Sequence, residues 1–418
     1  MPNKISLDAF ARDLKPGMRV FLPGMSGESL AIFDALSAQA ERCDGVEFVQ
    51  VAFPGINRSD FLALHPGVKQ RAYFMQAGIR KGLANGRAEL LPLDYPAIYR
   101  DLSALQPIDI AVAQLSQPDH NGRCSLGTCS DFQPAVLANA RRKVGHINPR
   151  MPRTAGSFDI AYQDLDTVIE ADAPLVEFDA GAPSAAMRQH AALIAQLVRD
   201  GDTLEFGIGK LQAAIPRALE SHRHLKVYSG MASTPLTELL DSGAVQGARS
   251  VQIGIAMGDA NFYARCQQDA AFYFRPVSET HDVRHIGAIE RFCAINSAVE
   301  VDLFGQTNAD SVNGKLIAGV GGLPAFAAGA RLSPGGRSII ALPSATDDGR
   351  FSRIVPTLSG PGLCALPRHV ADYVVTERGI AELAGKGIHQ RARALINIAA
   401  PQFQEPLERH WAQAAKKF

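Results

Sequence analysis

Residues 199–219 read RDGDTLEFGIGKLQAAIPRAL. A short apolar run ends at a glycine turn, and the turn opens onto a segment whose apolar residues recur at helical spacing. The stretch therefore predicts a strand, a tight turn and a helix. Residues 15–36, KPGMRVFLPGMSGESLAIFDAL, have the same order of glycine, apolar strand, glycine turn and helix. The two stretches predict two similar α/β halves.

Strands and helices alternate along the rest of the chain. Continuous apolar strands separated by helices are typical of a mostly parallel sheet that is covered on both faces. With 418 residues, the chain is too long for one hydrophobic core. We expect an α/β fold with two pseudo-equivalent domains, each a mostly parallel sheet with helices on both faces. Gly, Ala and Pro interrupt the pattern in FDAGAPSA, so we expect the domains to be residues 1–182 and 183–418.

Composition limits the class of partner. Lys plus Arg and Asp plus Glu both number 42, so no net charge favours nucleic acid or a membrane surface. No stretch reaches the roughly 20 apolar residues of a membrane span, and the first residues lack a cleavable leader pattern. We therefore expect a cytoplasmic protein with neither kind of partner. The six cysteines form no CxxC pair, so we expect no metal site and no disulfide framework.

Glycines gather where the predicted strands end. Glycine allows close backbone approach, backbone N–H groups at helix starts attract anions, and ligands of open α/β sheets bind beyond the carboxyl ends of the strands. FGIGK lacks the third glycine of a dinucleotide fingerprint. A GVGG turn could direct two N–H donors at a developing oxyanion. The glycines are Gly24, Gly27, Gly207, Gly209, Gly230 and the GVGG turn at 319–322.

Glu205 is the unusual residue of the quoted stretch. It lies within the apolar strand, two residues before the first glycine of the turn. A buried carboxylate is costly unless it is paired or used. Two interpretations follow: Glu205 takes part in chemistry, or it is a structural carboxylate that accepts hydrogen bonds from loop N–H groups.

Nine segments between residues 116 and 403 stand out together. They are SQPDHNGRCSLGTCSD (116–131), INPRMPRT (147–154), GDTLEFGIG (201–209), INSAVEVDLFGQ (295–306), AGVGGLPAF (318–326), LSPGGRSIIALPS (332–344), SRIVP (352–356), DYVVTERGIAELAGK (372–386) and RARALINIAAPQF (391–403). In this order they resemble the acetyl-CoA hydrolase/transferase group of class I coenzyme A transferases, which includes acetate and 4-hydroxybutyrate CoA-transferases.

The resemblance implies two CoA-transferase-like domains and an enzyme that moves coenzyme A between carboxylates. In such enzymes a glutamate attacks the acyl-CoA thioester and forms an anhydride, and the released thiolate then converts it into a glutamyl-CoA thioester. Acyl-CoA and a small carboxylate would be substrates, and no cofactor would stay bound. The resemblance also implies a homodimer or a larger homo-oligomer. Gly321 and Gly322 would supply N–H donors to the oxyanions.

The chain departs from the family pattern at the nucleophile. The family glutamate occurs in a segment like VHTEM, whereas residues 227–231 here read VYSGM and place Gly230 at that position. The preceding strand often has glutamine where this chain has Glu205. We therefore expect Glu205 to be the nucleophile, entering from the neighbouring strand the space left at Gly230. Glu279, in PVSETHDV, is a second candidate acid.

Further residues are expected to contact the substrates. The βα turn and the glycine positions would bind coenzyme A, and Arg337 would contact a phosphate group unless it is a solvated surface arginine. Met25 and Ser26 would line the acyl pocket, although a structural role for that turn is equally compatible with the sequence. The expected coenzyme A contacts are Gly207, Ile208, Gly209, Lys210, Gly230, Gly319 and Arg337.

Three functions remain open from the sequence. The first is a CoA-transferase with Glu205 as its nucleophile. The second is an acyl-CoA hydrolase of the same fold, in which water intercepts the acyl intermediate or Glu205 acts as a general base. The third is a CoA-binding protein without transferase activity, because the expected nucleophile position is Gly230.

Overall fold

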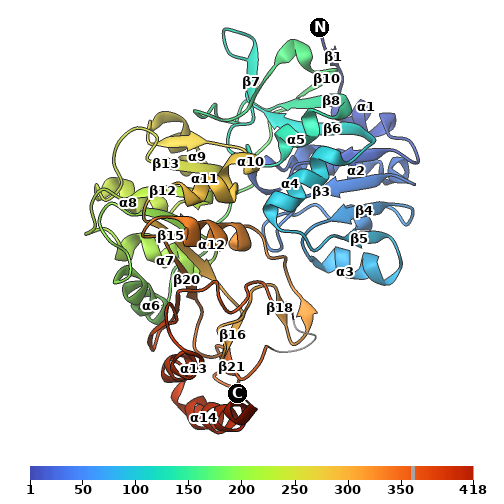
Figure 1. Ribbon diagram of the computed structural model, residues 1–418. Coiled ribbons are helices and arrows are strands. Elements are labelled where there is room, and N and C mark those ends of the chain that lie inside the picture. Colours follow the sequence, from blue (N-terminus) through green and yellow to red (C-terminus); the bar gives the residue numbers. More distant parts are fainter. Residues whose placement is uncertain (359–362, 418) are drawn as a thin grey trace. The chain divides into compact units, whose positions relative to one another are not determined.

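A computed structural model describes residues 1–358 and 363–417. By their internal contacts the residues form two compact units (Figure 1). The first unit comprises Met1–Asp179, Met231–Thr234 and Gly247–Thr280, and the second comprises Ala180–Gly230, Pro235–Gln246 and His281–Phe418.

The first unit is built on an eight-stranded, wholly parallel sheet. In spatial order its strands are β1 (Asn3–Lys4), β10 (Thr167–Glu170), β8 (Ala140–Ile147), β6 (Ile108–Leu115), β2 (Arg19–Phe21), β3 (Glu47–Gln50), β4 (Lys69–Ala72) and β5 (Ala88–Leu90). The helices of this unit are α1 (Leu7–Asp13), α2 (Leu30–Ala38), α3 (Ala77–Ala84), α4 (Tyr95–Ala104), α5 (Gln133–Leu137), α9 (Ala260–Gln268) and α10 (Val277–Thr280). Two more strand pairs complete it: β7 (Arg123–Ser125) with β9 (Asp159–Ala161), and β13 (Val251–Met257) with β14 (Phe272–Phe274).

The main sheet of the second unit is parallel except at one edge, where β23 runs antiparallel to β22. Of the eight strands of this sheet, those of the second unit are, in spatial order, β12 (Lys226–Ser233), β11 (Thr203–Phe206), β15 (Phe292–Ser297), β20 (Arg337–Ala341), β22 (Tyr373–Thr376) and β23 (Gly379–Glu382). Its helices are α6 (Ala185–Ala195), α7 (Lys210–Ala218), α8 (Leu236–Asp241), α11 (Val283–Gly287), α12 (Leu323–Leu332), α13 (Ile388–Asn397) and α14 (Pro401–Ala414). A small sheet and a hairpin follow β15: β16 (Glu300–Asp302), β17 (Thr307–Asn308) and β21 (Ile354–Val355), then β18 (Ser311–Val312) and β19 (Lys315–Leu316).

The expected pseudo-equivalence is visible in the strand order. The first sheet contains the parallel run β3-β2-β6-β8-β10, and the second contains β12-β11-β15-β20-β22. In both runs the first βα strand, β2 or β11, pairs with the next strand of the chain on one side and with a later one on the other. The two quoted sequence stretches therefore occupy corresponding places.

Helices cover both faces of each sheet, as the sequence predicts. In the second unit Phe292 and Ala294 of β15 pack with Phe326 of α12, whereas Ser297, on the opposite face, accepts a hydrogen bond from Gln212 of α7. In the first unit the odd-numbered residues of β6, including Ala111 and Ala113, pack with α4 and α5. On the other face the side chain of Gln114 donates to the carbonyl of Glu28, just before α2. The fold is therefore α/β with two layers of helices around each sheet.

Local signals determine several helix ends. Ser6, Ser29 and Ser184 each accept a hydrogen bond from a backbone N–H in the first turn of α1, α2 and α6. The last helix begins at Pro401, a position where proline is tolerated because the first helical residue needs no N–H donor. Among the described residues, every helix is too short or too polar to span a bilayer.

Candidate active site

Glu205 lies on a central strand of the second sheet. Strand β11 is hydrogen-bonded between β12 and β15, so the strand ends that carry Glu205 and Gly230 are neighbours, as expected. Glu205 is the register partner of Ala294, whose side chain packs against α12. Its carboxyl group is therefore on the α12 side of the sheet, where only 2% of the residue is exposed.

The carboxyl group of Glu205 has a specific partner. The side-chain amide of Asn296 donates a hydrogen bond of 2.6 Å to Oε2. Burial raises the pKa of Glu205 to about 8, and the hydrogen bonds from Asn296 and from the backbone of Ile295 offset part of that shift. A carboxyl group with this pKa exchanges a proton near neutral pH, which suits general acid–base or nucleophilic chemistry.

The turn after β11 leads directly into helix α7. Gly209 is the N-cap residue with a φ of 117°, a value that glycine adopts without strain, and no side chain caps the helix. Lys210, the first residue of the helix, is exposed. Gln212 is buried, and its Oε1 has no hydrogen-bond partner among the described residues. Gly207, Ile208, Gly209 and Lys210 thus form one continuous turn at the carboxyl end of β11.

The space beside Gly230 is occupied by His281. A Cβ atom placed on Gly230 would lie 2.9 Å from Cε1 and 3.0 Å from Nε2 of that imidazole, and 3.6 Å from the ring of Phe326. The expectation that Glu205 enters this space is therefore wrong, because a ring already fills it. Gly230 itself faces the α12 side, like Glu205.

The GVGG turn ends at the start of helix α12. Gly321 has a φ of 60°, so a larger side chain would strain the backbone there. Gly322 is the N-cap residue of α12 and has no side-chain cap. The N–H groups of the first helical turn lack intrahelical partners, which is the arrangement that stabilises an oxyanion. Gly319 lies in the loop before them.

Met25 and Ser26 form a buried turn in the first unit. Met25 has a φ of 52°, which is unusual for a residue with a side chain. Both backbone polar groups of Met25 bond to the side chain of Asn57, and Ser26 donates to the carbonyl of Thr128. Asn57 in turn donates to Glu28, whose carboxylate also accepts the backbone N–H groups of residues 58 and 59. The turn is held by a polar network that the sequence did not reveal.

Two other predicted residues are engaged elsewhere. Glu279 belongs to the first unit, is about half exposed and forms an ion pair with Arg275. Arg337 is not a solvated surface arginine, because it is only 6% exposed. Its guanidinium forms an ion pair with Asp202. Its remaining donors bond to the carbonyls of Leu197 and Gly335.

Two domain descriptions match this chain. The acetyl-CoA hydrolase/transferase N-terminal domain matches residues 3–178, and the C-terminal domain of the same name matches residues 258–411. The 4-hydroxybutyrate coenzyme A transferase of Clostridium kluyveri is 32% identical over 404 residues, which span 93% of this chain and 92% of that protein. The chain belongs to the acetyl-CoA hydrolase/transferase family.

Further similar proteins include a hydrolase and a solved structure. The acetyl-CoA hydrolase of Yarrowia lipolytica is 26% identical over 358 residues, covering 73% of this chain and 66% of that protein. The crystal structure of RipA from Yersinia pestis superposes with a TM-score of 0.90 at 26% identity, over 99% of this chain and 98% of RipA. The family thus includes both transferases and hydrolases.

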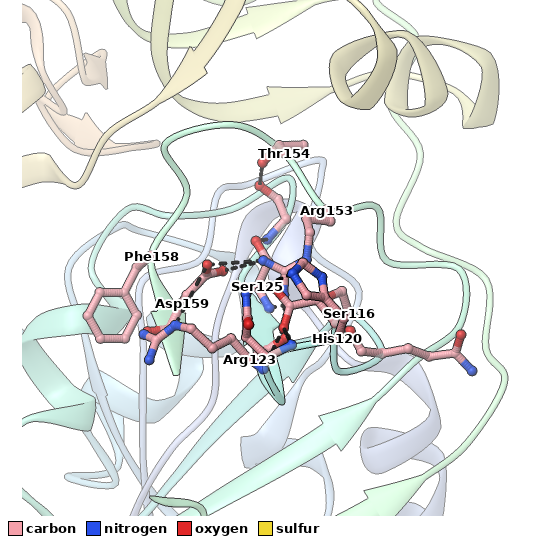
Figure 2. A network of polar contacts seen from close by, with 12 residues as sticks. Ser116, His120, Arg123, Ser125, Arg153, Thr154, Phe158 and Asp159 are labelled. Atoms are coloured by element: carbon pink, nitrogen blue, oxygen red, sulfur yellow. Dashed lines mark hydrogen bonds and ion pairs between the residues drawn. The ribbon is translucent and has the colours of Figure 1, made fainter. Parts of the chain in front are cut away.

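Two family segments of the first unit meet in the polar network of Figure 2. Arg153 bonds both carboxylate oxygens of Asp159 and the carbonyl of Arg123. The backbone N–H of Ser116 donates to the carbonyl of Ser125, and the backbone N–H of Ser125 donates to the hydroxyl of Ser116. The hydroxyl of Thr154 donates to the carbonyl of Gly127 at 2.6 Å. These contacts join the loops of the two segments to one another.

Sequence reasoning missed Asn296 and His281. Asn296 follows a buried strand within a family segment, and an amide there was a detectable signal for a carboxyl partner. His281 lies two residues after Glu279 in the same PVSETHDV segment, but its contact with two distant glycines exists only in the folded chain. His285, four residues later, stacks on Tyr228 at 5.4 Å. No cluster of three potential metal ligands occurs within residues 1–358 and 363–417.

Proposed function

We propose that this protein transfers coenzyme A from an acyl-CoA to a small carboxylate. The similarity to the Clostridium kluyveri 4-hydroxybutyrate coenzyme A transferase, which spans 93% of this chain, carries this proposal. The site supports it with a buried carboxyl group at a strand end and a glycine turn at the N-terminus of a helix in the same unit.

In the proposed reaction Glu205 is the group that holds coenzyme A. Its carboxylate attacks the thioester carbonyl, the C–S bond breaks, and the products are an acyl-glutamyl anhydride and the CoA thiolate. The thiolate then attacks the glutamyl carbonyl and releases the acyl carboxylate. A second carboxylate reverses these two steps and leaves with coenzyme A, which regenerates Glu205. The N–H groups at Gly321 and Gly322 would stabilise each oxyanion.

The remaining predicted contacts belong to this proposal. The turn at 207–210 would bind coenzyme A through backbone N–H groups and Lys210, together with Gly230 and Gly319. Arg337 does not join them, because its guanidinium is engaged by Asp202. Met25 and Ser26 would line the acyl pocket. We further propose a domain boundary near residue 182, a cytoplasmic location and a homodimer or larger homo-oligomer.

The test replaces Glu205 by Gln and by Ala and measures coenzyme A exchange between acetyl-CoA and succinate. We expect a loss of at least about 100-fold in both variants, because the covalent intermediate needs the carboxylate. Borohydride or hydroxylamine treatment followed by mass spectrometry should locate the adduct on Glu205 in the unmodified protein. Glu408→Gln, on the exposed face of α14, is the matched control. Full exchange in both Glu205 variants would remove the proposal.

Acyl-CoA hydrolysis is the second candidate, and the raised pKa of Glu205 favours it. A carboxyl group that titrates near pH 8 is a better general base than an ordinary glutamate. Release of free CoA thiol without an acceptor acid, at a rate unaffected by succinate, would identify the hydrolase. Binding of coenzyme A without either reaction would identify the third function, a CoA-binding protein.

A further inference from the structure

The imidazole of His281 lies between two glycines that the sequence places in the active site. A Cβ on Gly322 would lie 2.5 Å from Nε2 and 2.9 Å from Cδ2, and a Cβ on Gly230 would be nearly as close to the same edge of the ring. Contacts below 3 Å are incompatible with van der Waals radii. His281 therefore fits only because residues 230 and 322 both lack side chains.

The ring is fixed by packing. Its centroid is 4.6 Å from that of Phe326 on α12, the residue is 2% exposed, and burial lowers the pKa of the imidazole to about 3. The ring is consequently neutral at any pH at which the protein would be assayed. Phe326 in turn packs with Tyr228 and Phe292 of the sheet. The imidazole of His281 therefore packs against α12, the helix whose N-cap residue is Gly322.

We propose that His281 is a positioning residue. It occupies the side-chain space of residue 230 and sets the distance between the GVGG turn and strand β12. The inference rests on the proposed function, in which the N–H groups at Gly321 and Gly322 stabilise the oxyanions of the reaction. It has two consequences. No reacting side chain can be accommodated at residue 230 while His281 is present. The size of the imidazole ring determines the position of the N–H groups at Gly321 and Gly322.

The first experiment is a double-mutant cycle on thermal unfolding of the full chain. Gly230→Ala should lower the Tm in the presence of His281, because the new methyl group overlaps the ring. The same substitution should cost clearly less in a His281→Ala background. Gly387→Ala, whose new methyl group would be 3.7 Å from its nearest neighbour, is the control and should have the same effect in both backgrounds. Equal costs of Gly230→Ala in the two backgrounds would overturn the proposal.

The second experiment measures kinetics, which a purely structural role would not change selectively. His281→Ala should lower kcat, by about 100-fold if the GVGG turn moves by about 1 Å. The KM for acetyl-CoA should stay within about twofold of that of the unmodified protein. Rates are expressed per CoA-binding molecule from calorimetry, so that unfolded protein is not counted. His281→Asn serves in the same way if the alanine variant does not fold. An unchanged kcat in a variant that binds CoA would overturn the positioning role.

The third experiment asks whether residue 230 is closed. Gly230→Glu alone should give no CoA adduct at residue 230, whereas Gly230→Glu combined with His281→Ala should give one that borohydride traps. An adduct at residue 230 in the single variant contradicts the proposal. The unfolding cycle does not depend on catalysis, so a failure of the proposed function at Glu205 leaves that result intact.

Discussion

Asn296 donates its side-chain hydrogen bond to the carboxyl group of Glu205, although the two residues are 91 positions apart in the sequence. Both are buried, and the register of β11 with β15 puts them on the same face of the second sheet. This pair connects the strand that carries the candidate reacting group with the strand beside it. The properties of Glu205 therefore depend on a residue that only the sheet brings near.

The first prediction concerns the pH dependence of the reaction. The hydrogen bond from Asn296 lowers the pKa of Glu205, so Asn296→Ala should raise that pKa above its present value of about 8. Both proposed roles need the ionised carboxylate, and the rising limb of kcat/KM against pH should move to higher pH. Asn397→Ala, at an exposed position in α13, should leave the limb in place. If the rising limb of kcat/KM stays at the same pH in the Asn296 variant, the hydrogen bond between Asn296 and Glu205 does not control the reaction.

The second prediction concerns stability. The folded pKa of Glu205, about 8, lies above the ordinary value of 4.5, so the unfolded chain releases this proton at lower pH than the folded protein. The group's contribution to folding is therefore largest below pH 4.5 and is lost as the pH rises toward 8. Glu205→Gln removes this loss. Its Tm relative to the unmodified protein should increase between pH 5 and pH 8, whereas the Tm difference for Glu408→Gln should stay constant.

The third prediction concerns the buried ion pair of Arg337 and Asp202. Arg337→Met leaves an uncompensated carboxylate at a residue with no exposed surface and should cost about 3–5 kcal/mol of unfolding free energy. Asp202→Leu in the same chain should recover much of that loss, since apolar replacement of both partners is often tolerated. The affinity for coenzyme A per folded molecule should not change. Arg409→Ala, in an exposed pair with Glu405, should cost less than about 1 kcal/mol.

A lower affinity for coenzyme A per folded molecule of the Arg337 variant would contradict this structural role of Arg337. Isothermal titration with coenzyme A, performed well below the Tm of the variant, makes that comparison. Loss of a phosphate contact would weaken the affinity of the folded protein for coenzyme A. Loss of a structural ion pair would change only the fraction of protein that is folded.

The fourth prediction concerns the turn at Met25 and Ser26. The carboxylate of Glu28 accepts hydrogen bonds from Asn57, Arg58 and Ser59. Glu28→Gln places an amide group against these donors and should cost about 1–3 kcal/mol. Faster hydrogen exchange at the Met25 amide, which bonds to Asn57, would show that the turn has loosened. Glu41→Gln, at a side chain that is 90% exposed, should have no measurable effect on either quantity.

Much of the fold could be predicted because its signals are local. Ser6 and Ser184 cap the helices that follow them, and the apolar run at Thr203–Phe206 forms a buried parallel strand. The glycine of GVGG with a positive φ, Gly321, is equally local, because only the backbone of its own turn decides it. These residues carry their structural information within a few positions of themselves.

The candidate site could be predicted only in part. The sequence indicated Glu205 and the glycine turns, and the structure places them at strand ends and helix starts. It did not indicate that His281 fills the space at Gly230, or that Arg337 pairs with Asp202 across 135 positions. Side-chain volume and ion pairing depend on distances between elements, which have no signature in the spacing of residues along the chain.

The sequence by itself determined that this is a two-part α/β chain of the acetyl-CoA hydrolase/transferase family with a carboxylate in an unusual strand position. Tertiary structure alone decided what surrounds that carboxylate: an amide from the adjoining strand, and a neutral imidazole where the family segment would place a side chain. The physical reason is that helices and strands form from periodic patterns between near neighbours. A buried polar site forms from the few side chains that packing forces into contact.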